Sequence, residues 1–142
     1  MQKKSYLPDL LSDKHLLLRQ KVRMLWQQSG REDVTLAESH LLSLLEQQPE
    51  TIAGAARKMN ISRQAVHRCA KGLIEKKYID DKTIQKNERD KVLVLTDKGS
   101  AFCREIIEVK QQVEEEIAEK IGHENVIWLK KLLEENWDNK IM

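Results

Sequence analysis

A short segment in the middle of the chain, residues 51–77, concentrates basic side chains and constrains this sequence more than any other feature. It contains seven basic residues and a single acidic one, Glu75. Residues 1–50 and 78–96 each hold equal numbers of basic and acidic residues, and residues 97–142 carry seven basic against eleven acidic ones. The formal net charge of +2 therefore hides a strongly basic segment beside an acidic C-terminal one. Such a concentration of one sign is typical of a nucleic-acid-binding face.

The apolar residues of this segment predict two helices joined by a tight turn. The first helix has an apolar face at helical spacing, and so does the second. These faces consist of Ile52, Ala55, Ala56 and Met59 in the first helix and of Val66, Cys69, Ala70, Leu73 and Ile74 in the second. Asn60 and Ile61 interrupt the pattern, and the hydroxyl of Ser62 is expected to cap the second helix, 62–77.

The other face of the second helix carries the candidate DNA contacts. These are Ser62, Arg63, Gln64, His67 and Arg68. Their side chains have the hydrogen-bonding groups that contact base edges and phosphates when a helix enters the major groove. The alternative is a solvated face on an ordinary surface helix. The combination of helix, short turn, capped helix and one-signed charge favours DNA binding.

The rest of the chain predicts a mainly α-helical fold with a small β-wing. Helices are expected at 8–28, at 35–48 after a Thr35-x-x-Glu38 capping box, from Asp97 to Gly122, and from Val126 to Trp137. The second of them should complete a three-helix core with the two helices of 51–77. Short apolar runs at 78–79 and 92–95 predict two strands, with the polar segment 80–91 as the tip of their hairpin. Three basic side chains of this wing could reach a phosphate or the minor groove: Lys82, Lys86 and Arg89.

The first and last helices have more apolar surface than a small domain can bury. The simplest solution is a homodimer in which these helices of two chains interdigitate. We therefore expect one domain, 1–142, in three parts: an N-terminal dimerisation helix (1–32), a winged helix-turn-helix lobe (33–98) and C-terminal dimerisation helices (99–142).

The order of these motifs resembles the MarR family of bacterial winged-helix transcription regulators. The resemblance extends from about residue 8 to residue 139 and depends most on the spacing from Ser62 to the Leu95-Thr96-Asp97-Lys98-Gly99 motif after the wing. It implies an obligate homodimer with a triangular helical body that binds double-stranded DNA at a pseudo-palindromic operator. It also implies a repressor that a small molecule or oxidation releases.

The same resemblance assigns Ser62, Arg63, Gln64, His67 and Arg68 to the recognition helix and Arg89 to the wing. The sequence departs from the family in the wing. Asn87 stands where an aspartate usually braces the arginine, and Asp80-Asp81 stands where basic residues are frequent. These departures leave open a second function, a winged-helix module for protein interaction that does not bind DNA tightly.

Other functional classes have less support in the sequence. Cys69 and Cys103 form no CxxC pair, which favours a reducing cytoplasm; we expect Cys69 to be a core residue and Cys103 to be partly exposed. A redox switch at either cysteine remains a minor alternative. The four histidines are scattered without metal-ligand spacing, so neither a metal nor another cofactor is expected. No Ser-His-Asp set, P-loop or GxGxxG motif supports an enzyme, and no apolar run predicts a membrane span.

Overall fold

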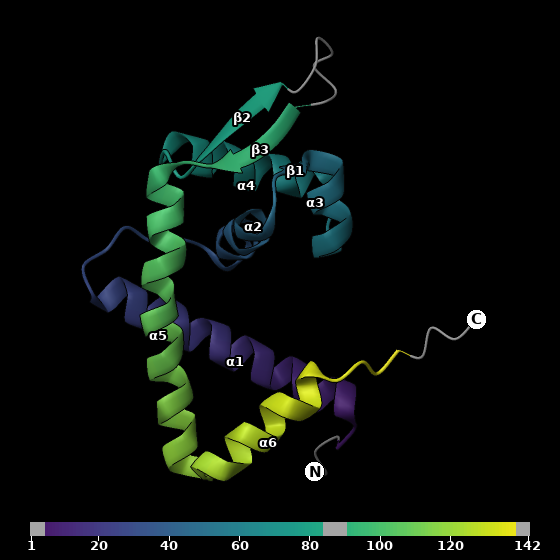
Figure 1. Ribbon diagram of the computed structural model, residues 1–142, viewed down its shortest axis with the longest axis vertical. Helices are drawn as coiled ribbons and strands as arrows, with labels where there is room; N and C mark the ends of the chain where they lie inside the picture. Colours follow the sequence, from purple (N-terminus) through teal and green to yellow (C-terminus); the bar gives the residue numbers. More distant parts are fainter. Residues whose placement is uncertain (1–4, 84–90, 139–142) are drawn as a thin grey trace.

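The computed structural model describes residues 5–83 and 91–138 and consists of a winged-helix lobe on a frame of three further helices (Figure 1). The frame contains α1 (Leu7–Gln28), α5 (Asp97–Ile121) and α6 (His123–Glu134). Figure 1 shows α5 running from the lobe to the far corner of the frame, where α6 turns back. The expected mainly α-helical fold with a small β-wing is confirmed.

The winged-helix lobe is built from three short helices and a three-stranded antiparallel sheet. Along the chain these are α2 (Leu36–Gln47), β1 (Glu50–Thr51), α3 (Ile52–Met59), α4 (Arg63–Glu75), β2 (Ile79–Thr83) and β3 (Lys91–Leu95). The strand order is β1-β3-β2. A three-residue turn separates α3 from α4, which is the arrangement of a helix-turn-helix.

A hydroxyl side chain caps the N-terminus of each helix of the lobe and of α5. The hydroxyl of Thr35 accepts from the backbone N–H of Glu38 at 3.1 Å, and the carboxylate of Glu38 accepts from the backbone N–H of Thr35 at 3.0 Å. The capping box is therefore confirmed. Ser62 caps α4 by accepting from the N–H of Ala65 at 3.0 Å, as predicted. The hydroxyls of Thr51 and Thr96 do the same for α3 and α5.

The core of the lobe lies between α2, α4 and the sheet. Its fully buried side chains are apolar residues of these elements: Leu41, Leu42, Val66, Leu73, Ile79 and Leu93. With Ala55 and Ala56 of α3 they form the three-helix core that the sequence predicted. Within the described ranges, 5–83 and 91–138, no helix is long and apolar enough to cross a membrane.

Three expectations about single elements were wrong, and one strand was missed. Asp80 and Asp81 lie within β2 and pair with Val94 and Leu93. The backbone groups of β3 form the pairing, so polar side chains on the partner strand do not prevent it. β1 was not predicted, since two residues show no alternation. Trp137 lies beyond the end of α6 and donates from Nε1 to the Leu132 carbonyl at 2.8 Å. Ile74 is exposed rather than part of the buried stripe.

Neither cysteine has the surroundings of a reactive thiol. Cys103 was expected to be partly exposed but is buried, 3.7 Å from the carbonyl oxygen of Leu42. Burial raises the pKa of Cys103 to about 11 and also raises the pKa of the half-buried Cys69. Because the thiolate is the reactive form, both thiols are poor redox sensors at neutral pH.

Candidate nucleic-acid interface

The surface of α4 presents all five residues that the sequence singled out on this helix. Ser62, Arg63, Gln64, His67 and Arg68 are each exposed. The inner face of the helix is apolar and buries Val66, Ala70 and Leu73. Its outer face carries polar and basic groups.

The turn before α4 fixes how this face projects. Asn60 adopts left-handed backbone angles, φ 56° and ψ 46°, which an asparagine tolerates better than most residues. The N–H groups of Asn60 and Ile61 then bond back to the last carbonyls of α3. The chain therefore passes from α3 to α4 within three residues, and the first residues of α4 are exposed.

Two of the seven basic residues of segment 51–77 are used inside the lobe. Lys58 pairs with the buried carboxylate of Glu50, and Lys76 lies 3.1 Å from the carboxylate of Glu38, which is 7% exposed. The other five form no ion pair with any residue in the described part of the chain and are exposed: Arg57, Arg63, Arg68, Lys71 and Lys77. The exposed basic surface is therefore smaller than the sequence predicted, because the acids that pair with Lys58 and Lys76 lie outside segment 51–77.

The wing is only partly described. Lys86 and Arg89 lie outside the described residues, as does Asn87. The backbone of Lys82 pairs with Val92 in the β2–β3 ladder. On the described part of the wing, Lys91 lies 4.0 Å from Asp81, so a lysine partly offsets the acidic pair.

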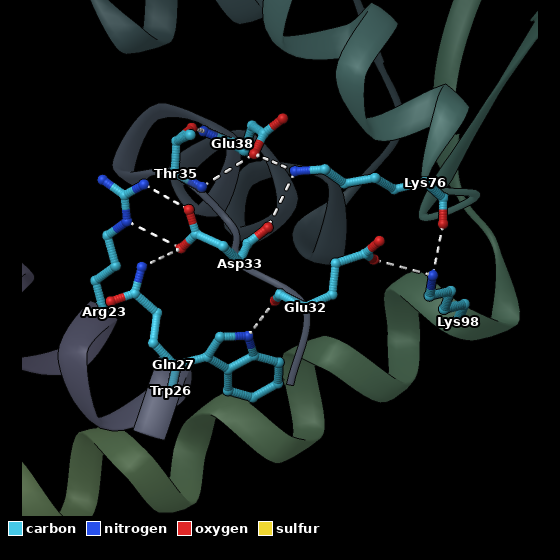
Figure 2. A network of polar contacts seen from close by, with 9 residues as sticks. All are labelled: Arg23, Trp26, Gln27, Glu32, Asp33, Thr35, Glu38, Lys76 and Lys98. Carbon is cyan, nitrogen blue, oxygen red and sulfur yellow. Dashed lines mark hydrogen bonds and ion pairs between the residues drawn. The ribbon is translucent and has the colours of Figure 1, made fainter. Parts of the chain in front are cut away.

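A network of polar contacts joins the C-terminus of α4 to the frame (Figure 2); we call it the polar junction. It consists of Arg23, Trp26, Gln27, Glu32, Asp33, Thr35, Glu38, Lys76 and Lys98. Lys76 donates from Nζ to the carbonyl of Asp33 at 3.0 Å and to Glu38 at 3.1 Å. Arg23 of α1 binds Asp33 through two hydrogen bonds, of 3.0 and 2.6 Å, and holds the pKa of Asp33 below its usual value.

The junction continues into α5 through Lys98. Its ammonium group donates to the Lys76 carbonyl at 2.7 Å and to the carboxylate of Glu32 at 3.2 Å. The same group lies 4.5 Å from the centre of the Tyr78 ring. Residues from four elements thus meet at the base of α4. The sequence did not reveal this site, because only the Thr35–Glu38 part of it is local.

Next to the junction is a groove lined by aromatic rings and cations. Trp26, Tyr78 and Phe102 meet edge to face, with centroids 4.8 Å (Trp26–Phe102) and 5.7 Å (Tyr78–Phe102) apart. Arg31 lies over Trp26 at 4.6 Å, and Glu32, Lys98 and Glu105 complete the rim. Burial, together with Glu32, raises the pKa of Tyr78 to about 12, so its hydroxyl remains a donor at neutral pH. Among the described residues no cluster of three or more His, Cys, Asp or Glu could hold a metal.

Comparison with proteins of known sequence and structure identifies this architecture. No protein-family model matches the chain. The transcriptional regulator TcaR of Staphylococcus aureus is 26% identical over 114 residues, which are 79% of this chain and 76% of TcaR. The apo form of MarR from E. coli superposes with a TM-score of 0.80 over 92% of this chain and 96% of MarR, at 17% identity. This chain has the winged-helix fold of MarR.

A second set of MarR-type structures carries ligands. A MarR family protein of Mycobacterium tuberculosis, 22% identical in its complex with salicylic acid, covers 93% of this chain and 96% of its own at a TM-score of 0.73. Its complex with DNA is 21% identical and covers 92% and 97% at a TM-score of 0.72. The MarR resemblance in the sequence is therefore confirmed, and the match extends over the frame as well as the lobe.

Proposed function

We propose that this MarR-type protein is a transcriptional regulator, a repressor, that binds double-stranded DNA sequence-specifically as a homodimer. The observation that carries this proposal is the exposed polar and basic face of α4, supported on an apolar inner face and preceded by a tight turn. The relatives support it, since TcaR is named a transcriptional regulator and a similar fold has been solved with DNA.

The homodimer is proposed from the frame. α6 contains no buried residue, and its apolar side chains face outward, among them Ile127, Trp128, Leu132 and Leu133. On α1, Leu7, Leu10 and Leu17 are also exposed. A second copy of the chain would cover these faces, so residues 1–32 and 99–142 would serve dimerisation and 33–98 DNA binding.

In such a dimer each α4 enters the major groove, and the two half-sites lie about one helical turn, roughly 10 bp, apart. Ser62, Arg63, Gln64, His67 and Arg68 contact the half-site. Lys82, Lys86 and Arg89 of the wing reach a phosphate or the adjacent minor groove.

The first experiment is the selection of bound duplexes from a random DNA pool, followed by titration of the selected duplex at several salt concentrations. A palindromic motif whose log K falls with log salt by about 0.9 per phosphate contact supports the proposal. The competing function is a protein-interaction module. No enriched motif, together with weak binding at low salt only, would favour that module.

Arg63→Ala is expected to weaken binding to the selected duplex by about 1–3 kcal/mol and to relax base preference at one position, because an arginine near the N-terminus of the helix can bind a guanine through two hydrogen bonds. Fluorescence anisotropy with duplexes substituted at each position measures both effects.

The control is Lys120→Ala, which removes the same charge from the distant end of α5. Equal losses in the two variants would indicate a general effect of charge. Unchanged affinity in Arg63→Ala would remove Arg63 from the interface.

We also propose that a small ligand relieves repression by binding in the groove beside the junction. The groove offers three aromatic rings, a phenol hydroxyl and the Arg31 cation, which is not engaged by Glu32 as Lys98 is; an aromatic carboxylate would pair with Arg31, opposed by the charges of Glu32 and Glu105. A related structure binds salicylic acid, which makes salicylate the first probe.

Salicylate is expected to bind the DNA-free protein and to lower its operator affinity, and Arg31→Met is expected to weaken both effects. Calorimetry measures the binding and anisotropy the affinity. Salicyl alcohol, which lacks the carboxylate, is the matched control and should have no effect. No heat of binding and an unchanged operator affinity would exclude this ligand class from the groove.

A further inference from the structure

The residues that end and follow α4 are held at the start of α5 through three consecutive backbone carbonyls. The last carbonyls of a helix have no partner within the helix. Here the carbonyl of Lys76 accepts from Lys98 at 2.7 Å, and those of Lys77 and Tyr78 accept from the hydroxyl and the N–H of Thr96 at 2.6 and 3.0 Å. Lys98 also places a positive charge at the negative end of the α4 dipole.

A second set of contacts holds the same end of α4 from the opposite side. Lys76 reaches back to the Asp33 carbonyl and to the buried Glu38, whose other contact is the N–H of Thr35. Asp33 is in turn fixed by Arg23 of α1. The end of α4 is therefore tied to both α1 and α5, and Figure 2 shows these ties converging on Lys76.

These ties are directional, whereas the apolar contacts beside them are not. Phe102 and Ile106 of α5 pack on neighbouring apolar residues, and apolar packing fixes proximity more than angle. Hydrogen bonds and ion pairs constrain the angle between two elements, because they weaken when poorly aligned. The angle of α4 to α5 thus depends on Lys76, Thr96 and Lys98.

We propose that Lys76 and Lys98 are positioning residues that set the half-site separation which the dimer accepts. The inference rests on the proposed DNA-binding function. Both residues act through the α4 backbone and not through DNA, since Lys76 lies roughly 20 Å along the helix from Arg63. When their contacts are lost, each lobe turns more freely on the frame, and the dimer accepts half-sites at several separations.

The test uses the full-length protein and duplexes in which the selected half-sites are moved one or two base pairs closer or further apart, with one duplex that has a single half-site. The wild type should lose about 100-fold or more in affinity when a shift of two base pairs prevents both lobes from binding together. Lys98→Met and Lys76→Met should reduce this discrimination to about threefold, with affinity for the single half-site and the salt slope unchanged.

Three further variants separate positioning from a general loss of structure. Lys98→Arg should restore the wild-type discrimination, because a guanidinium can donate to both Glu32 and the Lys76 carbonyl. Lys120→Met, on the same helix, should behave as the wild type. Lys98→Gln, which keeps one donor, replaces Lys98→Met in the test if the latter does not fold, as judged by its urea midpoint.

The outcomes are distinct. A broadened separation preference with unchanged half-site affinity supports the proposal. An unchanged preference in the lysine variants overturns it and leaves the DNA-binding function intact, and so does a parallel loss on all duplexes. Failure of the wild type to bind any duplex overturns the proposed function and this inference with it.

Discussion

Replacing Gly99 by alanine is expected to destabilise the protein by about 3 kcal/mol or more, the largest effect of any single methyl group that we predict. A Cβ atom at this position would lie 2.1 Å from the carbonyl oxygen of Tyr78 and 3.1 Å from a methyl group of Leu95. The nearer atom belongs to the backbone, so it cannot move without displacing the end of α4 or the start of α5.

This close approach explains the glycine in the Leu95-Thr96-Asp97-Lys98-Gly99 motif. Thr96 caps α5 and binds the carbonyls of Lys77 and Tyr78, which brings the first turn of α5 directly against them. Only a residue without a side chain fits between. Substitution should therefore also loosen the contacts of Thr96 and Lys98.

Urea unfolding of Gly99→Ala and the wild type, at equal protein concentration, measures the loss. Gly30→Ala is the matched control: its φ is +81° and nothing lies within 4 Å of an added Cβ, so only backbone strain of about 1 kcal/mol is expected. A Gly99→Ala midpoint as high as that of Gly30→Ala would mean that α5 does not approach Tyr78 so closely.

The double substitution Trp128→Glu and Leu132→Glu is expected to give a folded monomer and to weaken operator binding by about 100-fold or more, because one lobe then binds without its partner. These side chains are 63% and 49% exposed in the single chain, and α6 buries no residue. Their loss therefore removes little stability from the monomer but places two charges in the proposed interface.

Sedimentation velocity measures the oligomeric state, circular dichroism the fold, and anisotropy the operator affinity. Lys130→Glu is the control, since it changes the net charge by the same amount on the other side of the same helix, where Lys130 pairs with Glu114 of α5. A double variant that remains dimeric would contradict an interface through α6. A monomer with full operator affinity would contradict cooperative binding of two lobes.

Local signals in the sequence predicted most of the fold. The hydroxyl of Ser62 and the Thr35–Glu38 box act on backbone groups within three residues, so their helices began where the sequence indicated. The five exposed candidates on α4 follow from helical periodicity in the same way. Whether they contact DNA remains a prediction.

Features that depend on distant partners were not predictable. Lys76 was assigned to the basic surface, yet its partners Asp33 and Glu38 lie far upstream in the chain. The depth of Cys103 depends on α2, whose Leu42 carbonyl covers it. β1 exists only because β3 pairs with it, and no property of residues 50–51 indicates a strand by itself.

The length of α5 amplifies small changes at the lobe. Its 25 residues extend over about 37 Å, since an α-helix rises about 1.5 Å per residue. One end is fixed at the base of α4, and the other adjoins α6 (Figure 1). A tilt of about 5° between α4 and α5 would displace the far end by about 3 Å, close to the 3.4 Å spacing of successive base pairs. The helix is therefore a lever arm, in which a tilt of a few degrees at the lobe corresponds to a displacement of about one base-pair spacing at the far end.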